Sequence, residues 1–177
     1  MLAREGPRAV THRAVAAEAG TSVRATTYYF DSRETLLREA LTHYASTSME
    51  RFARIVAEGQ SEGRDPVEAA ADMLAATVLS DLEEDRAGLV AEMELALEVA
   101  RDPALEETYA AWERGLLDVL EGYAHMFHSA HPQRDARIVL ATLRGLEMEA
   151  LVHPSKKPTR AELRAIFATL LRAASGR

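Results

Sequence analysis

The chain has no cysteine, only two lysines and few aromatic residues, which make up 6% of its 177 residues. Without cysteine it can form no disulfide bond, no thiolate metal site and no thiol nucleophile. No apolar run reaches the roughly 18 residues that a transmembrane helix needs, and the N-terminus lacks the apolar segment of a signal peptide. We therefore expect a cytoplasmic protein that has no membrane partner.

The residues that are abundant favour helices. Alanine is the most frequent residue, and alanine, leucine, arginine and glutamate are all good helix formers, whereas β-branched and aromatic residues are scarce. With 47% hydrophobic and 28% charged residues, the composition is that of a folded globular protein. The sequence therefore predicts an all-α fold.

Charge is distributed unevenly along the chain. Residues 1–44 carry 6 arginines and 5 acidic residues, a net charge of +1, whereas residues 45–177 carry 15 basic and 23 acidic residues, a net charge of −8. An acidic body of this kind argues against nucleic-acid binding over the whole surface, but it leaves room for a small binding head. We predict two domains, residues 1–44 and 45–177.

Capping residues, prolines and glycines divide the chain into eight expected helices. These cover residues 11–19, 22–29, 31–59, 65–81, 86–101, 102–129, 133–152 and 159–175, and no segment reads as a strand. Asp31 with Glu34, and Thr159 with Glu162, have the spacing of a capping box at a helix start.

The segment 86–101 differs from the others because apolar residues lie on two of its faces. Leu95 and Val99 lie opposite a second apolar face, which consists of Leu89, Val90, Met93, Ala96, Leu97 and Ala100. We therefore expect a central helix with neighbours on two sides. Its narrow polar strip, formed by Glu94, Glu98 and Arg101, is interpreted as solvated, with recognition of a polar or cationic ligand as the alternative.

Residues 11–29 carry the strongest indication of function, because they form two short expected helices joined by a turn at Gly20. This is the layout of a helix-turn-helix, whose second helix fits the major groove of DNA while backbone N–H groups at its start face a phosphate. Glycine permits the tight turn, and Ala16 and Ala19 are small enough to let the two helices cross closely.

The stretch from Gly6 to Leu37, about a fifth of the chain, resembles the head of the tetracycline-repressor (TetR) family of transcriptional regulators. The matching positions are Gly6, Thr11, Ala19-Gly20, Ser22, Tyr29-Phe30 and Ser32-Arg33-Glu34. The family usually has an aliphatic and then an aromatic residue where this chain has Thr26 and Thr27. The resemblance implies a ligand-responsive regulator, not an enzyme, that represses by binding a palindromic double-stranded DNA operator as a homodimer. It implies an unknown small-molecule inducer and no cofactor.

The resemblance also assigns residues to the DNA interface. It implies phosphate contacts by Thr11, His12, Arg13, Ser22, Tyr28, Tyr29 and Arg33, and base contacts by Val23, Arg24, Ala25 and Thr27. Among these, Arg24 is best suited to a bidentate contact with guanine. The family's first helix is longer than residues 1–5, so we expect a missing N-terminal segment and exposed apolar surface around Val10, Val15 and Phe30.

Two further sets of residues are assigned to the body. The expected ligand pocket comprises Phe52, Met93, Tyr109, Trp112, Tyr123 and Phe127, for which a plain core role is the alternative. The expected dimer interface comprises Leu143, Leu146, Leu163, Ile166, Phe167 and Leu170. By resemblance, segments 133–152 and 159–174 pair with their copies in a four-helix interface, and the wide apolar stripe of the last helix needs such a partner surface.

Other functions are weaker candidates. His125, His128 and His131 could ligate a metal, but solvated histidines at a helix end are favoured because no acidic residue stands beside them, so we predict no metal site. The sequence shows no nucleophile elbow, phosphate-binding loop or marked carboxylate pair, which makes a small helical enzyme the third interpretation. The second is a helical small-molecule-binding protein that has lost DNA binding with its first helix.

Overall fold

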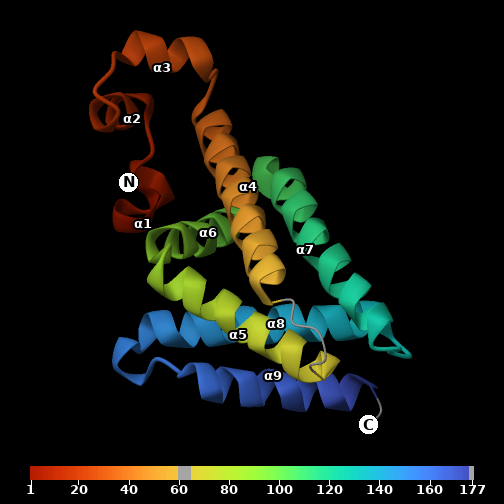
Figure 1. The fold of residues 1–177 in the computed structure, drawn as a ribbon. Coiled ribbons are helices and arrows are strands. Elements are labelled where there is room, and N and C mark those ends of the chain that lie inside the picture. Colours follow the sequence, from red (N-terminus) through yellow and green to blue (C-terminus); the bar gives the residue numbers. More distant parts are fainter. Residues whose placement is uncertain (60–64, 176–177) are drawn as a thin grey trace. The chain divides into compact units, whose positions relative to one another are not determined.

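The computed structural model describes residues 1–59 and 65–175, and within these ranges the chain folds into nine α-helices and no strand (Figure 1). The all-α prediction is confirmed, and the additional helix is the single turn α1. The helices are α1 Leu2–Glu5, α2 His12–Glu18, α3 Val23–Tyr29, α4 Arg33–Gly59, α5 Pro66–Glu83, α6 Arg86–Val99, α7 Glu106–Met126, α8 Pro132–Val152 and α9 Arg160–Ser175. Short 3₁₀ turns cover Pro7–Ala9, Pro103–Leu105 and Pro154–Lys156. Across the described residues, we find no helix of the length and hydropathy that would cross a lipid bilayer.

The starts of α2 and α3 are fixed by the side-chain caps that the sequence predicts. The Thr11 hydroxyl accepts a hydrogen bond from the Ala14 backbone N–H at 3.2 Å, and the Ser22 hydroxyl accepts one from the Ala25 N–H at 3.1 Å. Between the two helices Gly20 has a φ of 61°, in the left-handed region that costs glycine little. Both helices of the head therefore have defined ends.

The two predicted capping boxes have different outcomes. At α4 the Thr35 N–H donates to the Ser32 hydroxyl at 3.1 Å, so Ser32 rather than Asp31 caps the helix. At α9 the box is confirmed, because the Thr159 N–H donates to Glu162 Oε2 at 2.8 Å and the Glu162 N–H donates back to Thr159 Oγ1 at 3.3 Å. The hydrogen bonds from the backbone and hydroxyl of Thr159 lower the pKa of the Glu162 carboxyl.

The chain divides into two compact units, each built from segments that are distant in the sequence. Residues 1–48 and 86–112 form the first unit, and residues 49–85 and 113–177 form the second. Helices α4 and α7 contribute to both units, and the domain boundary predicted after residue 44 lies inside α4. Helix α6 thus belongs to the same unit as the helix-turn-helix.

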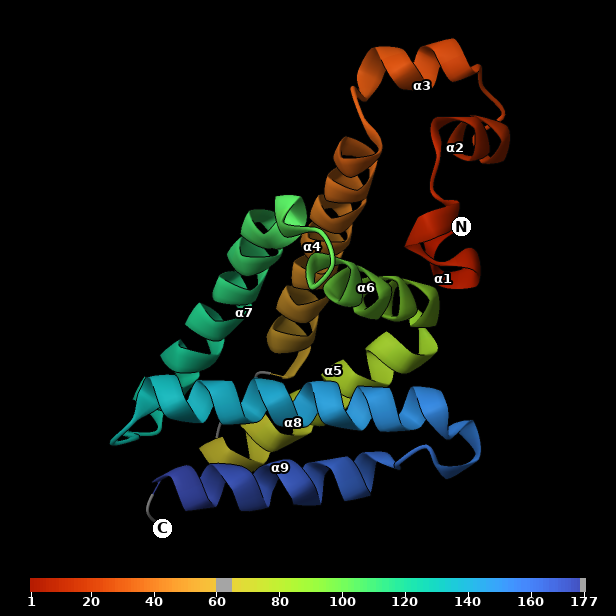
Figure 2. The ribbon, with the colours of Figure 1, turned by 180° about the vertical axis from the view of Figure 1, so that it is seen from behind.

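The core of the first unit joins α4 to α6. Leu37 and Leu41 of α4 are completely buried, as is Leu105, and they pack with Val10 and with Leu95 of α6 in one apolar cluster. Helix α6 contacts α1 and the turn Pro7–Ala9, and both views show it beside α1 (Figures 1 and 2). The head is therefore held together in part by side chains about 60 positions further along the chain.

The region around Val10, Val15 and Phe30 is less exposed than the sequence predicts. Val10 is only 5% exposed, and Val15 and Phe30 are half-buried against the same core. Met1 and Leu2 pack there as well, so the single turn of α1 covers part of the apolar surface. What stays open is an apolar groove of about 360 Å³ lined by these side chains.

The second unit is built around α5, α8 and α9, which lie side by side (Figure 2). Helix α9 packs along α5, and its Leu163 and Phe167 have no exposed surface. The same two helices are joined at their edge by ion pairs, among them a bidentate pair of Arg160 with Asp72 at 3.0 Å. The apolar stripe of α9 is therefore covered within the chain itself.

Helix α6 does not have the two apolar faces that the sequence predicts. Leu89 and Leu95 are 1% exposed, but Leu97 is 53% exposed. Two carboxylates are buried instead, Glu92 at 3% and Glu98 at 8% exposed. The interpretation of Glu98 as part of a solvated strip is wrong, because an ion pair with an arginine of α4 compensates its burial.

Candidate functional site

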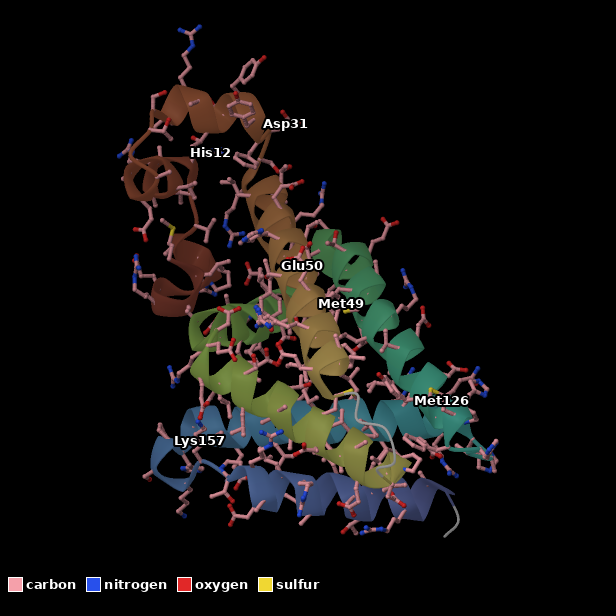
Figure 3. All side chains as sticks on the ribbon, in the orientation of Figure 1. His12, Asp31, Met49, Glu50, Met126 and Lys157 are labelled. Carbon is pink, nitrogen blue, oxygen red and sulfur yellow. The ribbon has the colours of Figure 1, made fainter. Side chains whose placement is uncertain are left out.

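Helix α3 presents most of its side chains to solvent. Val23 is 45%, Tyr28 79% and Tyr29 74% exposed, and Arg24 and Thr27 are also exposed. Figure 3 shows side chains of α3 extending outward, with Asp31 at the passage from α3 to α4. A short helix with this much free surface can enter a groove of DNA without moving any neighbouring element.

One residue of α3 faces the opposite way. Thr26 is 4% exposed, and its hydroxyl lies 2.8 Å from the Val23 carbonyl oxygen and 3.3 Å from the His12 carbonyl oxygen at the start of α2. This contact fixes the rotation of α3 against α2. The TetR family usually has an aliphatic residue at this position, and here a threonine makes a polar contact between the two helices instead. The exposed residues of α3 therefore point away from α2 and toward solvent.

The other residues assigned to the DNA interface have varied surroundings. Thr11, Arg13 and Ser22 are exposed, whereas His12 and Ala25 are half-buried. The Thr11 and Ser22 hydroxyl oxygens accept the capping hydrogen bonds, so each hydroxyl hydrogen stays able to donate to a phosphate.

Three side chains of α3 contact groups within the helix. The Thr27 hydroxyl lies 3.1 Å from both the Val23 and Arg24 carbonyl oxygens. The rings of Tyr28 and Tyr29 meet edge to face at 5.1 Å, which orders two exposed aromatic side chains beside one another.

Arg33 has the most distinct surroundings of the predicted phosphate contacts. Its Nη2 donates to the Pro7 carbonyl oxygen at 2.8 Å and to Glu98 Oε1 at 3.0 Å, and its side chain is 29% exposed. In this structure Arg33 therefore joins three segments of the first unit: the turn before α2, the start of α4 and the end of α6.

The structure places three of the predicted ligand-pocket residues in each unit. Met93, Tyr109 and Trp112 belong to the first unit, where Trp112 contacts Tyr109 and Tyr44 edge to face at 5.3 and 5.7 Å. The Tyr109 hydroxyl donates to Glu92 Oε1 at 3.2 Å. A buried carboxylate next to an aromatic cluster is an arrangement that can recognise a cation.

Phe52, Tyr123 and Phe127 belong to the second unit. Tyr123 and Phe127 line an apolar cavity of about 30 Å³ together with residues of α5, α8 and α9. A space of that size holds one or two water molecules, whereas pockets for drug-sized ligands measure about 300–1,000 Å³. Burial raises the pKa of the Tyr123 phenol.

The predicted dimer residues divide into buried and accessible ones. Leu163 and Phe167 are completely buried within the chain, so they present no surface to a second copy. Leu143, Leu146 and Leu170 are half-buried, and Ile166 is 39% exposed. The sequence predicts that the apolar stripe of α9 packs against a partner surface. That surface is α5 of the same chain.

A different apolar stripe is open on α8. Ile138, Met148 and Val152 are 45%, 44% and 61% exposed, and the small residues Ala141 and Gly145 between them are exposed as well. Their spacing of three and four residues puts all five on one face of the helix. We call this set the α8 stripe.

The three histidines lie near the end of α7 and the start of α8. His125 faces Glu121 at 3.6 Å, His128 has a φ of 57°, and His131 is the N-cap of α8. Among the described residues, no group of three metal-ligating side chains has the geometry of a metal site.

Sequence reasoning missed two residues of these sites. Glu92 could have been found, because it lies three residues after Leu89 and three before Leu95, inside the apolar face of α6. The polar contact formed by Thr26 has no such pattern, because it depends on how α3 is rotated against α2.

An all-helical chain with a capped helix-turn-helix and a second helical unit has the architecture of a DNA-binding regulator. Family models agree with this. The model described as bacterial regulatory proteins, tetR family, matches residues 1–40, and the model described as tetracyclin repressor-like, C-terminal domain, matches residues 65–173. The chain belongs to the TetR family of transcriptional regulators, which are not enzymes.

Solved structures show the same fold. A member of the TetR family from Streptomyces coelicolor A3 is 29% identical, with 95% of this chain and 90% of that chain covered and a TM-score of 0.75. The multidrug binding protein EbrR complexed with ethidium is also 29% identical, with 96% and 91% covered and a TM-score of 0.73. A transcriptional regulator from Rhodococcus sp. Rha1 is 22% identical, with 98% and 89% covered and a TM-score of 0.77. Comparison with curated protein sequences gives no significant match.

Proposed function

We propose that this protein is a ligand-responsive repressor that binds a palindromic DNA operator as a homodimer. The observation that carries the proposal is the orientation of α3, in which Thr26 is buried against α2 while Val23, Arg24 and Thr27 are exposed. Arg24 reads guanine in the major groove, and Val23, Ala25 and Thr27 contact neighbouring base edges. Thr11, His12, Arg13, Ser22, Tyr28 and Tyr29 hold the flanking phosphates.

The test of DNA recognition starts with selection of duplexes from a random pool by the purified protein. We expect an enriched near-palindrome, because a two-fold dimer places two copies of α3 in successive major grooves. Arg24→Ala should weaken binding to it by about 1–3 kcal/mol in a gel-shift titration. Arg38→Ala, which removes an exposed arginine of α4, is the control and should keep the operator preference. No enriched sequence, or equal binding by Arg24→Ala, would reject this interface.

The proposed dimer forms through the α8 stripe together with the exposed face of α9 around Ile166. A continuous run of exposed apolar and small side chains on one helix face favours close packing against a copy of itself. Met148→Glu should convert the dimer to a monomer in sedimentation velocity, because it buries an unpaired charge. Met126→Glu, which changes a 71% exposed methionine of α7, should leave the dimer intact. A dimer that tolerates Met148→Glu would place the interface elsewhere.

The proposed ligand is an aromatic cation. EbrR, to which this chain is similar, has been solved with ethidium and with proflavin, and both are planar aromatic cations. In this chain the buried Glu92 accepts a hydrogen bond from Tyr109, whose ring contacts Trp112, so a carboxylate and aromatic rings lie in one cluster. Met93, a predicted pocket residue of the same unit, supplies apolar surface.

Trp112 is the only tryptophan of the chain, so its fluorescence reports on this cluster. Titration with ethidium should quench Trp112 emission and should release the operator DNA. Glu92→Gln, which keeps the shape but removes the charge, should weaken ethidium binding about tenfold. Glu94→Gln on the same helix is the matched control. Equal affinity of the Glu92 variant would exclude this carboxylate from ligand recognition.

A further inference from the structure

The ion pair between Arg33 and Glu98 has a consequence for DNA binding. Arg33 is the first residue of α4, and only three residues separate it from Tyr29, the 74% exposed end of α3. An arginine at this place closely follows, in the sequence, the surface that α3 presents. Its guanidinium nevertheless contacts Glu98 and the Pro7 carbonyl oxygen, at 3.0 and 2.8 Å.

The burial of Glu98 keeps the pair together. The carboxylate side chain is only 10% exposed, and its other cationic neighbour, Arg101 Nη1, is 3.6 Å from Oε2, beyond hydrogen-bond length. If Arg33 turned outward, a buried carboxylate would lose its main partner and the Pro7 carbonyl would lose a donor. Orphaning a buried charge costs more free energy than a phosphate contact at a solvated surface returns.

We propose that Glu98 withholds the Arg33 guanidinium from the DNA backbone, so that the head makes one phosphate contact fewer than its arginines allow. The inference rests on the proposed DNA-binding function. Glu98 thereby lowers the affinity for DNA, because the end of α6 determines how many phosphates the head neutralises. Arg33 is a latent phosphate contact that becomes available when the charge of Glu98 is removed.

The test measures binding to a short fluorescein-labelled duplex of mixed sequence over a series of KCl concentrations. Each added phosphate contact makes the slope of log affinity against log salt steeper by about 0.9. Glu98→Gln keeps the side-chain shape and frees Arg33, so the slope should steepen by that amount and the affinity at low salt should rise about three- to tenfold. Glu94→Gln removes the same charge one turn earlier on α6 and should change the slope much less.

A double variant separates competition for Arg33 from a general change in charge. Arg33→Gln with Glu98→Gln removes both charges and should restore the wild-type slope. A double variant with a slope shallower than wild type by about 0.9 would show that Arg33 already contacts a phosphate, which overturns the proposal. Thermal unfolding by circular dichroism verifies that each variant is folded, and Glu98→Asp, which shortens the carboxylate, should shift binding in the same direction to a smaller extent.

The outcomes for the inference and for the proposed function are distinct. If the wild-type protein shows no salt-dependent binding to any duplex, the DNA-binding function itself fails. If the wild type binds but Glu98→Gln binds equally or more weakly with an intact fold, Glu98 only supports the structure and the inference is wrong. Tighter binding with a steeper slope, abolished by the added Arg33→Gln, supports it.

Discussion

Each of the two compact units combines a buried ion pair with exposed ones. The first unit buries an ion pair between α4 and α6, with 29% of Arg33 and 10% of Glu98 exposed. The second unit buries a pair between α4 and α5, with 14% of Arg51 and 12% of Asp81 exposed. At the edge between its α5 and α9, the pairs are exposed, as for Arg160, whose side chain is 60% exposed, with Asp72. A buried pair constrains its segments strongly because neither charge can be left alone, whereas an exposed pair adds little to stability. The contacts of α4 with α6 in the first unit and with α5 in the second are therefore sensitive to single charges, whereas the contact between α5 and α9 depends on its apolar packing.

The largest expected effect tests the apolar packing of the second unit. Phe167→Ala removes a completely buried ring between α9 and α5, and it should lower the free energy of unfolding by about 3–5 kcal/mol. Met126→Ala, which shortens a 71% exposed side chain of the same unit, should cost much less. Urea denaturation followed by circular dichroism measures both. Equal losses would mean that α9 does not pack on α5 through Phe167.

The next effect tests whether α6 belongs to the first unit. Leu95→Ala should lower the free energy of unfolding by about 2–4 kcal/mol, because Leu95 is 1% exposed within the core that contains Leu37 and Leu41. Leu97→Ala on the same helix, 53% exposed, should change it by about 0.5 kcal/mol or less. Leu95→Ala should also weaken DNA binding. A variant that loses stability but binds DNA normally would show that the head is independent of α6.

A smaller effect depends on pH. Burial acts to raise the pKa of Asp135, but hydrogen bonds from Ser129 and Arg134 outweigh this effect. The pKa of Asp135 therefore lies below the usual 3.8. A depressed pKa contributes stability that is complete above about pH 4 and is lost as pH falls through the folded-state value. Asp135→Asn should therefore cost about 1–2 kcal/mol at pH 7, and the difference from wild type should shrink below pH 4. Melting curves recorded from pH 7 to 2.5 measure it, and a difference that is constant across this range would contradict the assignment.

The smallest expected effect concerns the edge of the second unit. Asp72→Asn breaks the bidentate pair with Arg160 and should cost about 0.5–1 kcal/mol, since Arg160 is largely solvated. The loss should disappear in about 1 M KCl, where charges are screened over a few ångströms. A loss as large as that of Leu95→Ala would contradict the small contribution expected of an exposed ion pair.

Features set by neighbouring residues could be predicted from the sequence. The caps of α2, α3 and α9 depend on side chains within three residues of the backbone groups that they bind. For the same reason the turn at Gly20 and the order of the helices follow from local patterns. The family resemblance came from this region, and the family matches confirm it.

Features that depend on a distant partner could not be predicted. The apolar stripe of α9 shows that Phe167 is covered, but not whether α5 or a second copy covers it. Likewise the spacing of Glu98 from Glu94 and Arg101 fits both a solvated strip and a buried ion pair. Only the position of Arg33 in the fold shows that Glu98 forms a buried ion pair.

The discontinuous makeup of the first unit has a consequence for how the protein is made. Residues 1–48 are synthesised before Leu95 and Leu105, which complete their core. During that interval the nascent helix-turn-helix carries apolar side chains that have no cover, and such surface invites aggregation or chaperone binding. The head therefore matures only after more than half of the chain has been translated, and a gene truncated after α4 would encode no working module.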